Sequence, residues 1–163
     1  MGKMPVLCDL LIQAVHLYPR KRSNVFQIFP LGKVLGTDYL VAIVELGETG
    51  RVVRNLMLFE LKTAVAASVT SINGKQLAQV LVEGYYGLIG CEKNISAIVV
   101  ALTDINSTHF FKLRLPTTRT PCGRHLELMW YKKIEIKEFP PESTDGGVSE
   151  FIEFLHYVLD ELV

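Results

Sequence analysis

The sequence predicts an α/β fold in which a mixed β-sheet is flanked by helices. Its 163 residues suit a domain that is large enough to bury a hydrophobic core. Its composition, 49% hydrophobic and 21% charged, is typical of a globular protein and not of a disordered one. Segments with helical and with strand-like patterns follow one another in the order α-β-β-β-α-β, and then β-β-α.

The first half of the chain is expected to contain one helix followed by three strands. Apolar residues at helical spacing run up to Pro19, which ends the helix because proline cannot continue it. A short β-branched and aromatic segment then stops at Pro30. Two apolar runs joined by a turn at 47–50 predict a β-hairpin. The helix is expected over residues 5–17, and the strands over residues 25–29, 39–46 and 52–62.

The second half begins with the small and hydroxylated residues 63–73, which can form a loop or a short helix. The next segment places its apolar residues on one helical face. A continuous apolar run follows, and it is typical of a strand that is buried on both faces. Two more strands and an amphipathic helix complete the chain. These five elements are expected over residues 74–88, 95–102, 109–115, 126–136 and 148–162.

The predicted elements belong to one domain. A helix between the third and the fourth strand permits a parallel crossover, which makes the sheet mixed. No internal repeat and no low-complexity tract divides the sequence. We therefore expect a single domain over residues 1–163, with an αβββαβ core at 5–103 and a ββα extension at 104–163.

The net charge of zero conceals an uneven distribution. Residues 1–111 carry a net charge of +2, residues 112–137 one of +5, and residues 138–163 one of −7. Neutrality therefore does not exclude a nucleic-acid binder, because the basic segment can line a phosphate-binding face. The alternative is that its lysines are solvated residues at a strand edge, where they discourage aggregation.

Apart from Asn94-Ile95-Ser96 and Asn106-Ser107-Thr108, tripeptides of the glycosylation pattern that often arise by chance, nothing in the sequence indicates secretion or insertion into a membrane. Cys8, Cys91 and Cys122 are odd in number and widely spaced, so they do not form a disulfide framework. No apolar run approaches the roughly 20 residues that a membrane span needs, and the N-terminus lacks the layout of a signal peptide. We therefore expect an intracellular protein with no membrane partner.

The strand at 52–62 ends in a pattern that can carry chemistry. Alternate side chains of a strand share a face, so Glu60 and Lys62 point the same way. Both are costly to bury at the end of an apolar strand unless something pairs with them. Asp38 precedes the partner strand, so the hairpin can bring it and Glu60 together on one divalent ion. The alternative is that Glu60 and Lys62 are an ordinary exposed pair.

Four features follow one another in the sequence: Asp38, a β-hairpin, the triplet Glu60-x-Lys62 and a helix that carries Gln76. This combination resembles the PD-(D/E)XK nuclease superfamily, also called restriction-endonuclease-like. The common core of that superfamily is αβββαβ, which is the order predicted here for residues 5–103. The resemblance implies that Asp38 and Glu60 bind Mg²⁺ (or Mn²⁺). It also implies that Lys62 assists the attacking water and that Gln76 orients the lysine or the substrate.

Other residues fit the family's pattern less closely. Tyr85 and Tyr86 fit loosely the tyrosine that some members have on the helix after the lysine strand. Thr37 stands where the motif has its proline, and no glutamate occurs before Glu45, although the first helix of many members supplies one. These departures favour a module on the same scaffold that has lost catalysis.

Two hypotheses about function follow. The first is a metal-dependent nuclease that hydrolyses phosphodiester bonds of DNA, with basic side chains that steer the phosphate backbone to the metal. The second is a catalytically inactive nuclease-fold module that acts in protein–protein or nucleic-acid interaction, with the acidic C-terminal helix as a docking surface for a protein partner. The residues expected to bind nucleic acid are Lys112, Arg114, Arg119 and Arg124.

Overall fold

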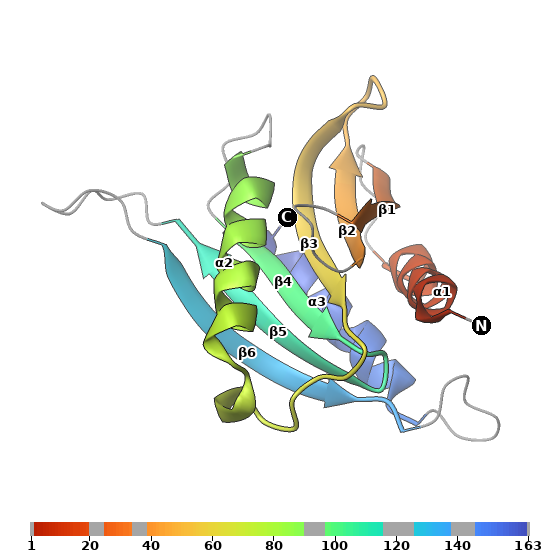
Figure 1. Cartoon of the computed structure of the whole chain (residues 1–163). Helices are drawn as coiled ribbons and strands as arrows, with labels where there is room; N and C mark the ends of the chain where they lie inside the picture. The colour runs from red at the N-terminus through yellow and green to blue at the C-terminus, as the bar shows by residue number, and fades with distance from the viewer. Residues whose placement is uncertain are drawn as a thin grey trace, which may run out of the picture.

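A computed structural model describes residues 2–19, 25–33, 39–89, 97–115, 126–137 and 146–162. Its elements follow one another in the order predicted from the sequence (Figure 1). The helices are α1 (Lys3–His16), α2 (Gly74–Ile89) and α3 (Val148–Leu162), and a single 3-10 turn at Val69–Ser71 precedes α2. The strands are β1 (Val25–Lys33), β2 (Tyr39–Leu46), β3 (Val52–Leu61), β4 (Ala97–Thr103), β5 (Ser107–Arg114) and β6 (Glu127–Glu135).

The six strands form one mixed sheet in the order β1-β2-β3-β4-β5-β6. Strands β3 and β4 pair in parallel, and the other four pairs are antiparallel. The parallel pair requires a crossover, which α2 provides as it runs across one face of the sheet (Figure 1). The structure thus confirms an α/β fold with a mixed sheet flanked by helices.

The sheet separates two hydrophobic cores. Helices α1 and α3 pack on one face, where the ring of Phe59 of β3 contacts those of Phe110 and Phe151, with centroids 6.1 and 6.4 Å away. Helix α2 packs on the other face, against Leu58 of β3 and Val100 of β4. Neighbouring residues of β3 therefore enter different cores, as the alternation of a strand requires. We call these two sides of the sheet the α3 face and the α2 face.

Strand β1 is longer than the sequence predicts. The predicted strand stops before Pro30, whereas β1 continues through Pro30 to Lys33. The pairing with β2 is irregular between Pro30 and Gly32. β1 lies at the edge of the sheet, where a proline at a bulge removes no hydrogen bond that an inner strand would need.

Helix α2 lies close to the sheet because it presents two glycines to it. A Cβ atom at Gly84 would come within 2.5 Å of a Leu113 methyl, and one at Gly87 within 2.7 Å of an Ile98 methyl. The three-residue spacing of these glycines places both on the same side of the helix. Their lack of side chains sets how near the polar residues of α2 come to β3. No helix within the described ranges is long and apolar enough to cross a bilayer.

Candidate functional site

Glu60 is a fully buried carboxylate at the C-terminal end of β3. Its side chain is 0% exposed and lies on the α2 face, while that of Phe59 enters the core of the α3 face. Its cross-strand neighbours are Leu40 on β2 and Leu102 on β4, which are also buried. An ionised group in such apolar surroundings is costly unless it is paired or binds a cation.

Lys62 supplies a positive charge to this carboxylate. Its Nζ atom lies 2.7 Å from Oε1 of Glu60, and its side chain is only 11% exposed. The same Nζ donates a hydrogen bond to Oε1 of Gln79 on α2, at 3.2 Å. The backbone N–H of Lys62 donates to the carbonyl of Thr103 at 2.8 Å, which fixes the chain where it leaves β3. The two charges therefore share one face, as the sequence predicts, but Glu60 is buried and Lys62 is partly buried, so they are not an exposed pair.

Gln79, and not Gln76, is the glutamine of α2 that contacts Lys62. The backbone N–H of Gln76 donates to Oδ1 of Asn73 at 2.8 Å, so Asn73 caps the helix and Gln76 lies in its first turn. Gln79 lies one turn further along and reaches Lys62 from there. The resemblance assigns the orienting role to Gln76, whereas the geometry favours Gln79.

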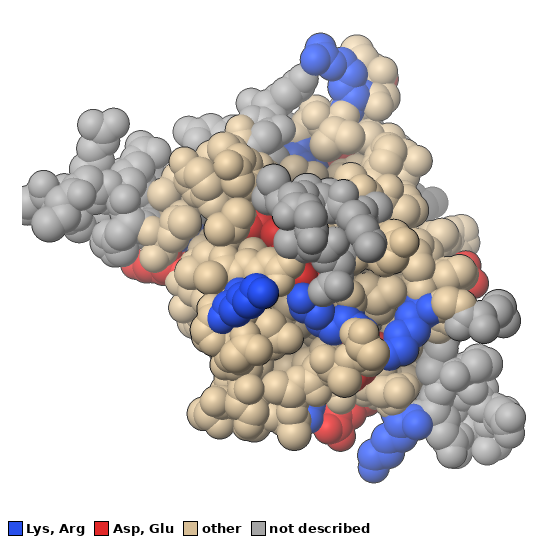
Figure 2. Space-filling model, in the orientation of Figure 1, with Lys and Arg blue, Asp and Glu red and all other residues tan. Residues whose placement is uncertain are grey.

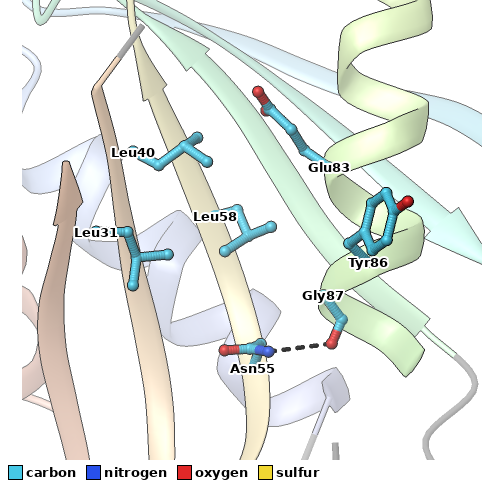
Figure 3. A pocket seen from close by; sticks show the side chains of 7 residues that line it. All are labelled: Leu31, Leu40, Asn55, Leu58, Glu83, Tyr86 and Gly87. Carbon is cyan, nitrogen blue, oxygen red and sulfur yellow. Dashed lines mark hydrogen bonds between the residues drawn. The ribbon is translucent and has the colours of Figure 1, made fainter. Parts of the chain in front are cut away.

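Glu83 is a second buried carboxylate on α2, and the sequence pattern does not reveal it. Its side chain is 3% exposed, and it follows Gln79 by four residues, so both lie on the same side of the helix. Glu83 lines a cavity of about 180 Å³ between α2 and strands β1–β3 (Figure 3). The sequence gives one indication of its burial, namely that Glu83 lies on the same side of the helix as Val80 and Gly87.

The cavity is lined by residues of β1, β2, β3 and α2. Leu40, which pairs with Glu60 across the strands, lies on its wall opposite Glu83 (Figure 3). Asn55 of β3 closes one end by donating a hydrogen bond to the carbonyl of Gly87 at 3.0 Å. Tyr86 also lines the cavity, although its side chain is 56% exposed. The lining of the cavity does not include Tyr85, whose side chain is 41% exposed.

Three of the predicted site residues lie outside the described residues. These are the metal ligand expected from the resemblance and two of the expected phosphate contacts, namely Asp38, Arg119 and Arg124.

Lys112 and Arg114 lie on the α3 face of the sheet and not on the side of Glu60. Lys112 pairs across the strands with Val99, whose side chain belongs to the core of the α3 face. Its Nζ atom lies 3.6 Å from Oε2 of Glu161 on α3. Arg114, two residues further along β5, donates two hydrogen bonds to Glu127, at 3.0 and 2.6 Å. The structure therefore separates both basic residues from the Glu60–Lys62 pair.

The acidic helix α3 also lies away from this pair. Its buried side chains, among them Phe151 and Leu155, pack on the α3 face. It carries Glu150, Glu153, Asp160 and Glu161 and has no basic residue in its last turn. The α2 face is thus not covered by the most acidic element of the chain.

The segment from β3 to α2 is held on the α2 face by side chains from distant parts of the sequence. Lys3 of α1 donates to the carbonyl of Thr63 at 2.7 Å. The His109 ring, which is fully buried, bonds through Nε2 to the carbonyl of Ala66 at 2.8 Å. The sequence does not indicate these contacts, because more than forty residues separate His109 from its partner.

Two further contacts complete the attachment of this segment. Trp130 donates from Nε1 to Nδ1 of His109 at 3.2 Å, so Nε2 of His109 carries the proton that Ala66 accepts. Lys133 of β6 donates to the carbonyl of Ala67 at 2.6 Å. Residues 63–67, which follow Lys62, are therefore held by side chains from α1, β5 and β6.

Among the described residues, no group of three or more His, Cys, Asp or Glu side chains is placed to hold a metal ion. Comparisons with protein-family models, with curated proteins and with solved structures find no match to this chain. The function of the site is therefore inferred from its own residues.

Proposed function

We propose that this chain is a metal-dependent nuclease that hydrolyses phosphodiester bonds of DNA. The observation that carries the proposal is the buried pair of Glu60 and Lys62, which is joined to α2 through Gln79. The order of elements around the pair, αβββαβ, supports it, because this is the order that the resemblance to the PD-(D/E)XK superfamily implies.

The burial of the pair favours a functional role over a structural one. Opposite charges in a protein interior usually recover only part of the free energy that their desolvation costs. The cross-strand partners of Glu60 on both neighbouring strands are buried leucines, so an apolar residue at position 60 would fit the surrounding core. Charged groups that are kept in such surroundings are concentrated at active sites.

The donor chemistry of the site fits a hard divalent cation. The carboxylate oxygens of Glu60 are ligands that Mg²⁺ and Mn²⁺ prefer, and Asp38 would supply a second carboxylate. When bound there, the ion would polarise the scissile phosphate and lower the pKa of a bound water.

Lys62 and Gln79 have distinct parts in this mechanism. The ammonium of Lys62 lies 2.7 Å from Oε1 of Glu60 and donates a hydrogen bond to Gln79. In the proposed mechanism it positions the attacking water or a phosphate oxygen, and its charge stabilises the negative charge that develops in the transition state. Gln79 positions the ammonium from the opposite side of the site.

The alternative is a catalytically inactive module that acts in protein–protein or nucleic-acid interaction. Helix α3 supports it, since its acidic residues form a surface that a basic protein partner could contact. This surface lies across the sheet from Glu60, so docking on α3 would not cover the α2 face, on which the candidate site lies. The two proposals therefore differ only in whether Glu60 and Lys62 act on a substrate.

Cleavage of plasmid and single-stranded DNA in Mg²⁺ or Mn²⁺ tests the proposal. The native chain is compared with Glu60→Ala and Lys62→Ala, and with Lys132→Ala as a control that removes a lysine from the other face. We expect cleavage by the native chain and the control, its loss on chelation of the metal, and its loss in both site variants. Equal activity in all four proteins would exclude the proposed site.

A further inference from the structure

Three lysines surround the segment that joins β3 to α2, and the proposed chemistry leaves them without a role. Lys3 and Lys133 donate to the carbonyls of Thr63 and Ala67, at 2.7 and 2.6 Å. Lys75 is exposed in the first turn of α2, where this segment ends. We call Lys3, Lys75 and Lys133 the lysine rim.

Lys75 and Lys133 of the lysine rim lie on the same side of the sheet as the candidate site, whereas Lys3 reaches the segment from α1, which packs on the α3 face. One row of cross-strand partners runs through β3, β4, β5 and β6. It consists of Glu60, Leu102, His109 and Lys133, whose side chains therefore share the α2 face. Lys3 contacts Thr63, the residue that follows Lys62 in the chain. Figure 2 shows this face, and lysine and arginine side chains are spread across its centre and its right-hand part.

The charge of the rim is only partly balanced by acids nearby. Lys133 pairs with Glu135 at 2.8 Å. Asp104 is a second acid beside the segment, where its carboxylate accepts the backbone N–H groups of Val65 and Ser107, at 3.0 and 2.7 Å. The first turn of α2 has no acidic residue, and Glu83, the one acid of the helix, is buried. The N-terminal end of α2 adds the partial positive charge of a helix dipole.

The lysines of the opposite face are balanced by α3. Lys132 lies 3.0 Å from Glu150, and Lys112 lies 3.6 Å from Glu161. A polyanion that approached the α3 face would meet these glutamates together with the lysines. Electrostatics therefore favours the α2 face for contact with a phosphate backbone.

We propose that the phosphate backbone of a nucleic acid crosses the β3–α2 segment on the lysine rim, which leads it to Lys62. This inference rests on the proposed function and replaces Lys112 and Arg114 as its phosphate contacts. An ammonium has three donors, so Lys3 keeps two for phosphate oxygens while it holds the backbone of the segment. Contacts of this kind are independent of base sequence, so the rim sets affinity and not sequence preference.

Binding of labelled single-stranded and double-stranded DNA at several salt concentrations, without a divalent metal, tests this inference. The native chain is compared with a rim variant, Lys3→Gln, Lys75→Gln and Lys133→Gln together. The control variant, Lys112→Gln, Arg114→Gln and Lys132→Gln together, removes equal charge from the α3 face. The logarithm of the DNA-binding constant falls with the logarithm of the salt concentration, and each phosphate contact that is lost makes this slope less steep by about 0.9 for duplex DNA. We expect the slope of the rim variant to fall by about 2 to 3 and that of the control to stay unchanged.

Two results would overturn the inference, namely an unchanged slope in the rim variant or an equal loss in the control. Lys75→Gln alone serves as a control for a folding defect, because Lys75 makes neither of the two lysine bonds that help to hold the segment. It should lower the slope by about 1. If the native chain cleaves DNA but the rim variant binds DNA with an unchanged salt dependence, the proposed role of the lysine rim is refuted and the proposed nuclease activity is not.

If DNA binding depends on the rim but no metal-dependent cleavage is found, the proposed nuclease activity is refuted and the role of the rim is not.

Discussion

The Nζ atom of Lys62 lies 2.7 Å from Oε1 of Glu60, a carboxylate with no exposed surface. The carboxylate lies between the buried leucines of β2 and β4, and the Lys62 side chain is only 11% exposed. Each of the two charges therefore depends on the other for its burial. This dependence can be measured separately from activity.

Replacing Lys62 alone should destabilise the protein more than replacing both members of the pair. Lys62→Met leaves the charge of Glu60 buried without its ammonium, which costs about 3–5 kcal/mol in comparable pairs. The double variant Glu60→Gln, Lys62→Met should recover most of this loss, because no charge then remains buried. Urea unfolding at neutral pH measures the free energy of unfolding of each protein. If the loss of unfolding free energy in the double variant equals the sum of the losses in the two single variants, Glu60 and Lys62 do not stabilise each other.

Gln79→Ala should lower the rate of DNA cleavage, whereas Gln76→Ala should not. Gln79 accepts the hydrogen bond that positions Lys62, and removing such an outer contact typically costs 10- to 100-fold in activity. Gln76 contributes its backbone to the cap of α2, and alanine keeps that backbone N–H. Initial rates with saturating metal provide the comparison. A larger loss in Gln76→Ala would restore the role that the family resemblance assigns to Gln76.

The stability of the protein should fall in acid partly through Glu161. The hydroxyl of Tyr131 donates a hydrogen bond to Glu161 and lowers the pKa of that carboxyl, with smaller contributions from Tyr157 and Lys112 and with burial acting in the opposite direction. A depressed pKa stabilises the folded state above the unfolded pKa, and this contribution is lost as the pH falls through the folded pKa.

Tyr131→Phe isolates this contribution. The variant should be less stable than the native chain at neutral pH, and the difference should narrow as Glu161 becomes protonated below its ordinary pKa of 4.5. Urea unfolding across the acid range gives the two curves. A constant difference at every pH would show that the hydrogen bond does not act through the charge of Glu161.

Gly147→Ala should be more destabilising than Gly50→Ala. Gly147 joins the end of β6 to α3 with a φ of 104°, and a Cβ atom there would come within 2.2 Å of the carbonyl oxygen of Glu135. Gly50, in the β2–β3 turn, has a φ of 77° and no atom within 4 Å of an added Cβ. We expect a loss of about 1 kcal/mol at Gly50 and of about 3 kcal/mol at Gly147. Equal losses of stability would argue against the close contact with Glu135.

The order of the elements can be predicted because each one leaves a local signature. The apolar run of β2 and the amphipathic pattern of α3 define these elements with the bounds that the structure has, Tyr39–Leu46 and Val148–Leu162. The same alternation places Glu60 and Lys62 on one face of β3. Local patterns are therefore sufficient for the strand that carries the proposed chemistry.

The partners of these residues depend on packing that the local patterns do not contain. Apolar spacing in α2 favours a buried side that includes Tyr85, but the helix turns Glu83 and Gly87 to the sheet and leaves Tyr85 41% exposed. The reason is the close approach at Gly84 and Gly87, which selects the rotation of α2 and thereby Gln79 as the partner of Lys62.

The face of β5 is equally ambiguous from sequence. Phe110 and Phe111 are adjacent and both buried, one in each core, so alternation alone does not say on which face Lys112 lies. The pairing of Lys112 with Val99 decides it. The strand pairing, which the composition does not reveal, thus places Lys112 on the face of the sheet opposite the candidate site.

The most direct test of the central claim is the single-turnover rate of plasmid cleavage by Glu60→Gln in saturating Mg²⁺. This substitution keeps the size of the side chain and its ability to accept a hydrogen bond from Lys62, but removes the charge that would bind the metal. We predict that the native chain cleaves the plasmid and that Glu60→Gln, folded to the same extent, loses at least about a hundred-fold in rate. A rate for Glu60→Gln equal to that of the native chain would contradict the assignment of Glu60 and Lys62 as the catalytic pair.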